Sequence, residues 1–394
     1  RGRLLQRLLL LTLTSAAAAA ASLLETASRR GGVSVSGFSS GANIALNYFL
    51  SHAADEAVSG LMLLGGSPYG CQTLPDAGDT CGTPTGSLAT NASWTQFNAR
   101  FLEYLKAKVK RGVIDDPEDY RGKPAFLYSG TRDSVVFQVV MRAVADQLSS
   151  IGLNVTAEFG IESEHAWIVD GAVCPVPRTI NFTRCCGLKG NVGSCFPPDM
   201  VVPPPDFWSV TGDVQPDHNC GCAACGDGST GAGWWRPPVN NCAYDLSGAM
   251  LRVILGLDAS GGRLAPASVF PSADNLVRFN QSLFAPGGDA ESVGMDAAGF
   301  VYLPRVCRES SLSLSRLGGN TAASLPSSLP PRVGGGCHVH IHFHPCGGNW
   351  QTVSARYMLG TRLAAYADTN RIAILFPQTS SRYPPTVASP PART

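Results

Sequence analysis

The sequence contains little charge and no excess of charge of either sign. Charged residues make up 15% of its 394 residues, and the formal net charge is +1. Proteins that bind nucleic acids or strongly acidic partners carry basic patches or a marked positive charge, so we expect no nucleic-acid partner. Hydrophobic residues make up 44% of the chain, which is enough for a substantial core.

The chain also lacks a long apolar run and an internal repeat. Its most apolar segment, Leu8–Leu13, is too short to cross a bilayer. Arginines precede this segment and a run of alanines follows it, which is typical of a secretory signal peptide. We therefore expect residues 1–22 to be a signal peptide, residues 23–394 to form a single catalytic domain, and the protein to be secreted. A membrane anchor is the alternative for residues 1–22, but we expect no stable membrane insertion.

Cysteine, in contrast, is abundant. The thirteen cysteines indicate an oxidising compartment, where disulfides persist, and their odd number leaves at least one thiol free or paired between chains. Eight lie in residues 174–242, which we expect to be a disulfide-tied insertion or lid; a zinc site in residues 220–225 is the alternative. Cys307 and Cys337 flank a Ser-rich loop, and we expect them to form a disulfide. Four N-glycosylation triplets agree with secretion and begin at Asn91, Asn154, Asn181 and Asn280.

Short β-branched or apolar segments alternate with segments of helical periodicity in the first half of the chain. This alternation is typical of an α/β fold with a mostly parallel sheet and helices on both faces. The expected strands are residues 33–36, 61–64, 125–128 and 155–159, and the expected helices are residues 42–50, 94–110 and 137–151.

The motif that points most directly to catalysis is Gly37-Phe38-Ser39-Ser40-Gly41. It fits the Gly-x-Ser-x-Gly nucleophile elbow, in which a sharp turn between a strand and a helix exposes the serine hydroxyl. A β-branched run precedes the motif and an apolar helical segment follows it, and its glycines allow the helix to pass close to the strand. We therefore predict Ser39 to be a nucleophile. The alternative is a Gly/Ser-rich turn without a catalytic role.

A nucleophilic serine needs a base, and the base needs an acid to orient it. In α/β-hydrolases the chain order is serine, acid, histidine. Asp133 lies in the loop after the expected strand 125–128, and His165 follows the next expected strand. Of the seven histidines, His165 is the one that fits this position. We therefore predict a triad of Ser39, Asp133 and His165, with Glu162, Glu164 and Asp170 as alternative acids.

Ser39 lies unusually early, because an α/β-hydrolase sheet normally has several strands before its nucleophile. Residues 300–378 contain two further apolar segments, 339–343 and 372–376, with helical spacing at 357–367 between them. The simplest explanation is a circular permutation in which these late strands complete the sheet.

With these features the sequence resembles the secreted polyhydroxybutyrate (PHB) depolymerases, in their circularly permuted α/β-hydrolase form. The resemblance implies a serine ester hydrolase with the Ser39–Asp133–His165 triad. It also implies an oxyanion hole made by the backbone N–H groups of Ser40 and Cys346, no cofactor, and a polyester or small ester as substrate. The matching segments are residues 33–42, 65–71, 129–133, 241–245, 337–346 and 368–378.

Two features depart from the family. Pro345 stands where the family has glycine in a His-Gly-Cys sequence, and proline fixes φ near about −65°. We therefore expect the Cys346 N–H to be imperfectly aimed. The family's tryptophan-rich segment after the last strand has no counterpart in residues 379–394, where Tyr383 is the only aromatic residue. The second departure bears on polymer binding and leaves the predicted ester hydrolysis unchanged.

Four histidines alternate with apolar residues along one expected strand, at His338, His340, His342 and His344. Side chains two residues apart share one face of a strand, so these imidazoles could in principle bind a metal. Of these four, only His340 and His344 match the family that the sequence resembles, and the other two fall at variable positions. The resemblance therefore favours a role without metal, and we expect no metal site.

The sequence as a whole predicts an ester hydrolase that acts on short hydroxyalkanoate polyesters or oligomers through an acyl-enzyme. A carbohydrate-side esterase that releases acetyl or feruloyl groups would share the same catalytic residues. A catalytically impaired hydrolase-fold binding protein is the alternative from another functional class, and a fluorophosphonate probe separates it from both esterases.

Overall fold

The computed structural model describes residues 32–54, 58–71, 81, 91–133, 135–163, 165–170, 239–242, 244–256, 264, 275–304, 307, 337–353 and 355–380. The expected signal peptide, nearly all of the Cys-rich segment 174–242 and the triplet at Asn181 lie outside these residues. The division of the chain into a signal peptide and one catalytic domain therefore stays a prediction.

An eight-stranded sheet forms the centre of the described structure, with the order β4-β3-β2-β1-β9-β10-β8-β7. Neighbouring strands from β4 to β10 pair in parallel, whereas β8 runs antiparallel to both β10 and β7. The strands are β1 (Val33–Phe38), β2 (Val58–Leu64), β3 (Pro124–Tyr128), β4 (Asn154–Glu158), β7 (Leu276–Asn280), β8 (Ala298–Tyr302), β9 (His338–Phe343) and β10 (Ile372–Phe376). A second, two-stranded sheet pairs β5 (Trp167–Val169) with β6 (Val239–Asn241) in parallel.

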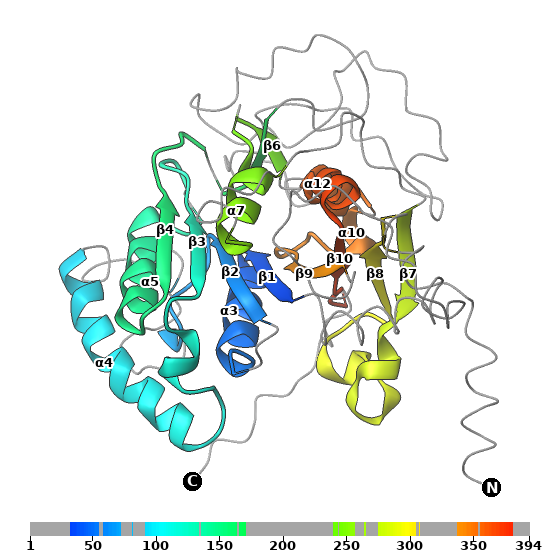
Figure 1. Ribbon diagram of the computed structural model, residues 1–394. Coiled ribbons are helices and arrows are strands. Elements are labelled where there is room, and N and C mark those ends of the chain that lie inside the picture. The colour runs from blue at the N-terminus through cyan, green and yellow to red at the C-terminus, as the bar shows by residue number, and fades with distance from the viewer. Residues whose placement is uncertain are drawn as a thin grey trace, which may run out of the picture.

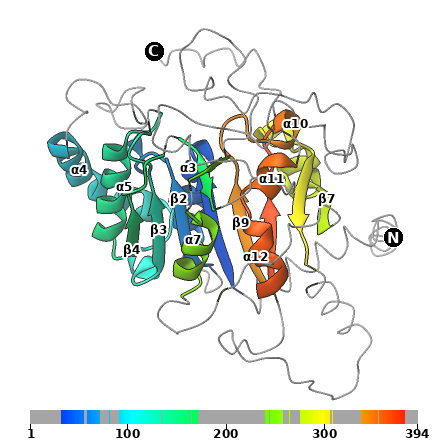
Figure 2. The same ribbon diagram turned by 90° about the horizontal axis from the view of Figure 1, so that it is seen from above.

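Helices cover both faces of the large sheet (Figures 1 and 2). One face carries α3 (Ser40–Ser51), α4 (Asn91–Lys110) and α5 (Gln138–Ser150), and the other carries α7 (Leu246–Ile254), α11 (Arg356–Gly360) and α12 (Leu363–Asn370). The remaining short helices are η3 (Pro117–Tyr120), η7 (Gln281–Phe284), η8 (Pro286–Gly288), η9 (Glu291–Val293) and α10 (Trp350–Val353).

Strand alternation divides the core between the two faces. Val35 on β1 and Leu63 on β2 face α3, α4 and α5, whereas Phe38 and Leu64 face the opposite helices. Strands buried on both faces are expected to be apolar almost throughout, as β2, β3 and β10 are. Each large apolar side chain that is fully buried contributes about 1.5–3 kcal/mol to folding.

The late strands lie inside the sheet, as a circularly permuted α/β-hydrolase fold requires. β9 sits between β1 and β10, and its pairing places His340 opposite Ser34 and Ile341 opposite Val35. In Figure 2 the blue β1 and the orange β9 are neighbours although they come from opposite ends of the chain. The strand that leads to Ser39 is therefore flanked by a strand from the C-terminal part.

The predicted disulfide between Cys307 and Cys337 is confirmed, with a Cα–Cα distance of 5.8 Å. A second disulfide joins Cys71 and Cys81, and Cys346 is a free, exposed cysteine. Among the described residues, no helix combines the length and the apolar character needed to span a membrane.

Candidate active site

Ser39 occupies a strained turn between β1 and α3. Its backbone angles are φ 57° and ψ −123°, which a residue with a side chain rarely adopts. The turn is held by the Ser39 N–H, which donates to the Leu64 carbonyl at 2.8 Å. Both flanking glycines are needed at this turn. A Cβ on Gly37 would lie 2.1 Å from the Gly41 carbonyl oxygen, and a Cβ on Gly41 would lie 2.4 Å from that of Phe343.

Asp133 lies in the loop after β3 and is buried. Its Oδ1 accepts the backbone N–H groups of Val135 and Val136, at 3.0 and 2.8 Å. Its Oδ2 lies 2.8 Å from Nδ1 of His165. The two backbone bonds fix the carboxylate so that its second oxygen faces the imidazole.

His165 is oriented by this contact. Because a carboxylate only accepts, Nδ1 of His165 carries a hydrogen, and in the neutral imidazole Nε2 is then an acceptor. Nε2 is buried and has no hydrogen-bond partner in the described part of the chain. An imidazole with an oriented Nδ1–H and an available Nε2 is the arrangement that a general base requires.

The imidazole of His165 fits into a space left by a glycine at the end of β2. Gly65 has φ +56°, and a Cβ there would lie 2.7 Å from Cε1 of His165. On its other side the imidazole packs against Phe38, with 4.7 Å between ring centroids. Phe38 directly precedes Ser39, so the structure brings His165 beside the serine turn. The described residues contain no hydrogen bond between Ser39 Oγ and His165 Nε2, and such bonds often tighten only when substrate binds.

The two loops that carry Asp133 and His165 are bonded to each other. The Thr131 N–H donates to the Ile161 carbonyl at 2.9 Å, and the Arg132 N–H donates to the Ser163 carbonyl at 3.0 Å. The Arg132 side chain also donates to Glu162, with Nε to Oε1 at 2.7 Å. Of the alternative acids, Glu162 is thus paired with an arginine, and Glu164 lies outside the described residues.

The two residues expected to supply the oxyanion hole are also neighbours. Ser40 begins α3, and Cys346 follows β9 in a turn. The Cys346 thiol lies 3.2 Å from Oγ of Ser40. The Cys346 N–H forms no hydrogen bond within the described residues, so it is available to a ligand.

Pro345 is part of a well-bonded turn. Its carbonyl accepts the Gly348 N–H at 2.9 Å and Nδ1–H of His344 at 2.8 Å. Gly347 has φ 70°, which suits the third position of such a turn. The Thr379 N–H donates to Nε2 of His344 at 3.1 Å, and burial lowers the pKa of His344, so this imidazole is neutral with its hydrogen on Nδ1. The turn therefore accommodates the proline, and the aim of the Cys346 N–H stays a prediction.

The alternating histidines bond to serines of the neighbouring strand. Ser34 Oγ lies between His338 and His340, and Ser36 Oγ lies between His340 and His342, at 2.7–2.8 Å. Within the described ranges, no group of three or more histidine, cysteine or acidic side chains is arranged to hold a metal.

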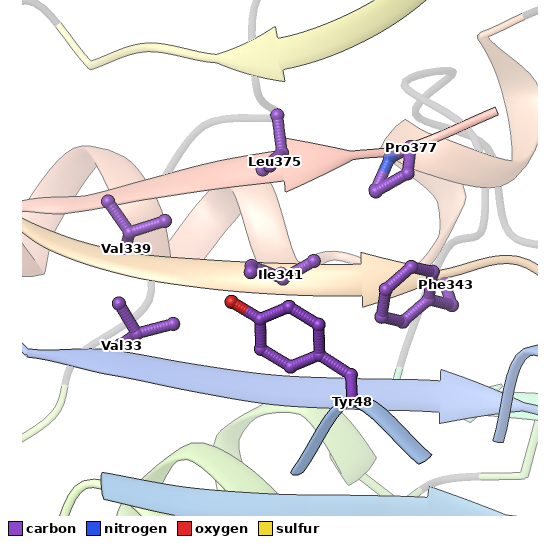
Figure 3. Close-up of a pocket in the computed structure, with 7 residues that line it drawn as sticks. All are labelled: Val33, Tyr48, Val339, Ile341, Phe343, Leu375 and Pro377. Carbon is purple, nitrogen blue, oxygen red and sulfur yellow. The ribbon is translucent and has the colours of Figure 1, made fainter. Parts of the chain in front are cut away.

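A cavity of about 320 Å³ lies on the opposite face of β1, β9 and β10, away from these histidines. Figure 3 shows Ile341 in the middle of the lining residues, next to the ring of Tyr48 from α3. Its lining is apolar apart from the Tyr48 hydroxyl and includes none of the predicted catalytic residues. It is formed by Val33, Tyr48, Val339, Ile341, Phe343, Leu375 and Pro377.

Three residues near the site were missed by the sequence analysis. Gly65 and Gly130 are positions where a side chain would collide with His165 and with the Ser163 carbonyl, respectively. Trp167 follows His165 by two residues and is fully buried. For Gly65, the Gly65-Gly66 pair directly after an apolar run was a signal that the sequence contains. The roles of Gly130 and Trp167 depend on contacts between segments that are distant in the sequence.

Comparisons with known proteins agree with this picture. The chain is 26% identical over 359 residues to a poly(3-hydroxybutyrate) depolymerase from Delftia acidovorans, which covers 88% of this chain and 52% of that protein. It is 28% identical over 148 residues to a polyhydroxybutyrate depolymerase from Talaromyces funiculosus, covering 37% of this chain and 33% of that protein. The chain thus spans about half the length of the Delftia protein. No protein-family model matches the chain.

Two solved structures share the fold. A PHB depolymerase complexed with an R3HB trimer has a TM-score of 0.54 at 19% identity, and a PHB depolymerase from Penicillium funiculosum has a TM-score of 0.53 at 20% identity. Each comparison covers 89% of this chain and 80% of the solved chain. The chain has an α/β-hydrolase fold and is related in sequence to the PHB depolymerases, as its motifs predict.

Proposed function

We propose that the protein is a secreted serine esterase that cleaves short hydroxyalkanoate polyesters or their oligomers. The observation that carries the proposal is the contact between Asp133 and His165 beside the strained turn of Ser39. The relatedness to PHB depolymerases, among them one complexed with an R3HB trimer, supports the choice of substrate.

In the proposed reaction, Ser39 Oγ attacks the ester carbonyl carbon while its proton passes to Nε2 of His165. Asp133 holds the resulting imidazolium in place through Nδ1–H. Collapse of the tetrahedral intermediate breaks the bond to the alcohol oxygen, which takes the proton from Nε2. An acyl group remains on Ser39. Water then repeats the attack with His165 as base, releasing the carboxylic acid and restoring the serine.

Negative charge on the carbonyl oxygen develops in both steps. The backbone N–H groups of Ser40 and Cys346 are proposed to stabilise it, and removal of one such donor costs about 2.7–4 kcal/mol in other serine hydrolases. Ser40 sits at the N-terminus of the twelve-residue helix α3, where backbone N–H groups are unpaired and favour an anion.

Secretion and glycosylation are part of the same proposal. The disulfides Cys71–Cys81 and Cys307–Cys337 suit an oxidising compartment. Asn154 and Asn280, which begin two of the triplets, are exposed.

A substrate panel tests the proposal. Purified protein would be assayed on short nitrophenyl esters, hydroxybutyrate oligomers and acetylated xylan, with Ser39→Ala as the control. Turnover of the oligomers that is lost in Ser39→Ala is the expected result. Preference for acetylated xylan would instead identify a carbohydrate-side esterase, and no turnover of any ester would contradict hydrolase function.

A further inference from the structure

A continuous chain of hydrogen bonds runs through the buried face between β1 and β9. It connects His338, Ser34, His340, Ser36, His342 and Tyr357, which we call the Ser–His ladder. The four bonds between β1 and β9 are 2.7–2.8 Å long. The last bond joins Nε2 of His342 to the Tyr357 hydroxyl on α11 and is 2.9 Å long. All six side chains are at most 2% exposed.

The members of the ladder depend on one another. Burial lowers the pKa of His340 to about 3 and that of His342 well below its usual value, so both imidazoles are neutral. Each neutral imidazole and each hydroxyl carries one hydrogen. His340 and His342 each take part in two bonds and carry one hydrogen, so each donates one bond and accepts the other. Ser34 and Ser36 each lie between two ring nitrogens, and loss of either hydroxyl leaves buried ring nitrogens unpaired.

The ladder adjoins three segments of the candidate active site, those that carry Ser39, Cys346 and His165. Ser36 lies three residues before Ser39 on β1, and His342 lies four residues before Cys346 on the segment that follows β9. The imidazole of His342 also packs edge-on against Trp167, with 4.8 Å between ring centroids. Trp167 is fully buried, donates from Nε1 to the Thr361 carbonyl at 3.1 Å, and follows His165 by two residues.

The opposite face of the same strands carries apolar side chains. There Val35 faces α3, and the odd-numbered residues of β9 line the apolar cavity of Figure 3. Parallel strands buried on both faces are usually apolar throughout, and buried polar groups cost free energy unless they are fully bonded. A polar ladder on one face is thus an arrangement that apolar packing alone does not require.

We propose that Ser36 and His342 are positioning residues: the ladder fixes β1 against β9 and, through Trp167, sets His165 relative to Ser39 and Cys346. This inference rests on the proposed esterase function. A shift of about 1 Å in a reacting group can cost a hundredfold in rate, so the ladder acts on kcat and leaves substrate binding largely unchanged.

Ser36→Ala tests the proposal, with Val35→Ala as the matched control. Both changes shorten a fully buried side chain in β1, but Val35 lies on the face without the ladder. Both variants would be compared with wild type at a temperature where thermal unfolding shows all three to be folded. We expect kcat for a nitrophenyl ester to fall about ten- to a hundredfold in Ser36→Ala with little change in KM, and to stay near the wild-type value in Val35→Ala.

Tyr357→Phe provides a second, milder test, because it removes only the terminal hydroxyl and keeps the ring. If the ladder acts as a unit, the loss of kcat in the double variant Ser36→Ala/Tyr357→Phe is smaller than the product of the single losses. Equal kcat in wild type and folded Ser36→Ala, or independent effects in the double variant, would overturn the positioning role while leaving the esterase proposal intact. If Ser36→Ala does not fold, an unchanged kcat in Tyr357→Phe has the same meaning. Absence of wild-type turnover would overturn both proposals.

Discussion

At the scale of single residues, the site depends on glycines as well as on its predicted catalytic side chains. Gly37 and Gly41 allow α3 to start beside β1, and Gly65 leaves room for the imidazole of His165. Each of these positions has a protein atom within 3 Å of where a Cβ would stand. The space around Ser39 is therefore set by glycines on three different segments of the chain.

Gly65→Ala should therefore impair catalysis beyond its cost in stability. The new Cβ would meet His165 at 2.7 Å, and φ is +56°. Gly112→Ala is the matched control, because Gly112 has φ +65° and nothing within 4 Å. Both changes carry a backbone cost of roughly 1–2 kcal/mol. We expect kcat to fall at least about tenfold in Gly65→Ala and to stay near the wild-type value in Gly112→Ala. Both variants would be assayed at a temperature where they are folded. Equal kcat in the two variants would contradict the position assigned to His165.

The role given to Cys346 belongs to its backbone, not to its thiol. Cys346→Ser should therefore keep kcat within about twofold of wild type, because the N–H donor is retained. A bulky maleimide should inactivate the wild type, since the exposed thiol lies 3.2 Å from Ser40 Oγ, and should leave Cys346→Ser active. Turnover before and after labelling checks both points. Strong loss of activity in unlabelled Cys346→Ser would show that the thiol itself takes part.

Much of the site could be predicted from the sequence, because its residues stand next to recognisable elements. Ser39 follows a β-branched run, and Asp133 and His165 follow two later strands, so the parallel arrangement predicts that they meet at one edge of the sheet. The expected effect of Pro345 came from its fixed φ alone. The sequence could not show that Gly347 and Gly348 complete a turn around it, because turn geometry depends on the bonds of the folded chain.

At the scale of secondary structure, the predicted strands and helices lie within about three residues of the observed ones, with one exception. Strand β10 spans the predicted residues 372–376, and β9 begins one residue before its predicted start. The predicted helix 357–367 is instead two helices, because Arg362 takes the left-handed conformation with φ 60°. Strand β7 and helix α7 were not predicted; β7 is a short edge strand of mixed polarity, which periodicity does not distinguish from a loop.

The histidines of β9 predict an acid sensitivity. Burial lowers the pKa of His340 to about 3 and also lowers that of His342, whereas in the unfolded chain both values are about 6.5. Below about pH 6.5 the unfolded chain thus binds more protons, so the free energy of unfolding should fall as the pH drops towards 3. The slope is at most about 1.4 kcal/mol per pH unit for each histidine. Urea unfolding between pH 7.5 and 4 measures it, and a flat profile would contradict neutral, buried imidazoles.

At the scale of the whole molecule, the sheet has two outer strands, β4 and β7, and each carries an N-glycosylation triplet. Asn154 begins β4, Asn280 ends β7, and both side chains are exposed. Unpaired sheet edges promote association between chains, and bulky groups on an edge oppose it. Glycans at these two positions would therefore shield both edges of the sheet.

Expression in a eukaryotic secretory system tests this arrangement. Glycopeptide mass spectrometry should find glycans on Asn154 and Asn280. The double variant Asn154→Gln/Asn280→Gln should aggregate more readily on heating, with kcat unchanged because both sites lie on the outer strands. Thr156→Ala removes the first triplet without changing its asparagine and serves as the control for that position. Unmodified asparagines in the secreted protein would refute the prediction.

The permuted order of the strands was also predictable from the sequence, through the early position of Ser39 and the resemblance to the permuted family. Too few strands precede Ser39 to form the usual sheet, and segments 339–343 and 372–376 form the strands β9 and β10 that complete it. The course of the chain across the second face, including the parallel pair β5 and β6, depends on contacts that no local pattern encodes.

The central claim is that Ser39 is the nucleophile of an esterase, and covalent labelling tests it most directly. The protein would be treated with a fluorophosphonate, digested and mapped by mass spectrometry, while turnover of a nitrophenyl ester is followed in parallel. We predict one modified residue, Ser39, with turnover lost in proportion to labelling and both signals absent from folded Ser39→Ala. Labelling of a different residue, or near-equal turnover by wild type and Ser39→Ala, would contradict the account.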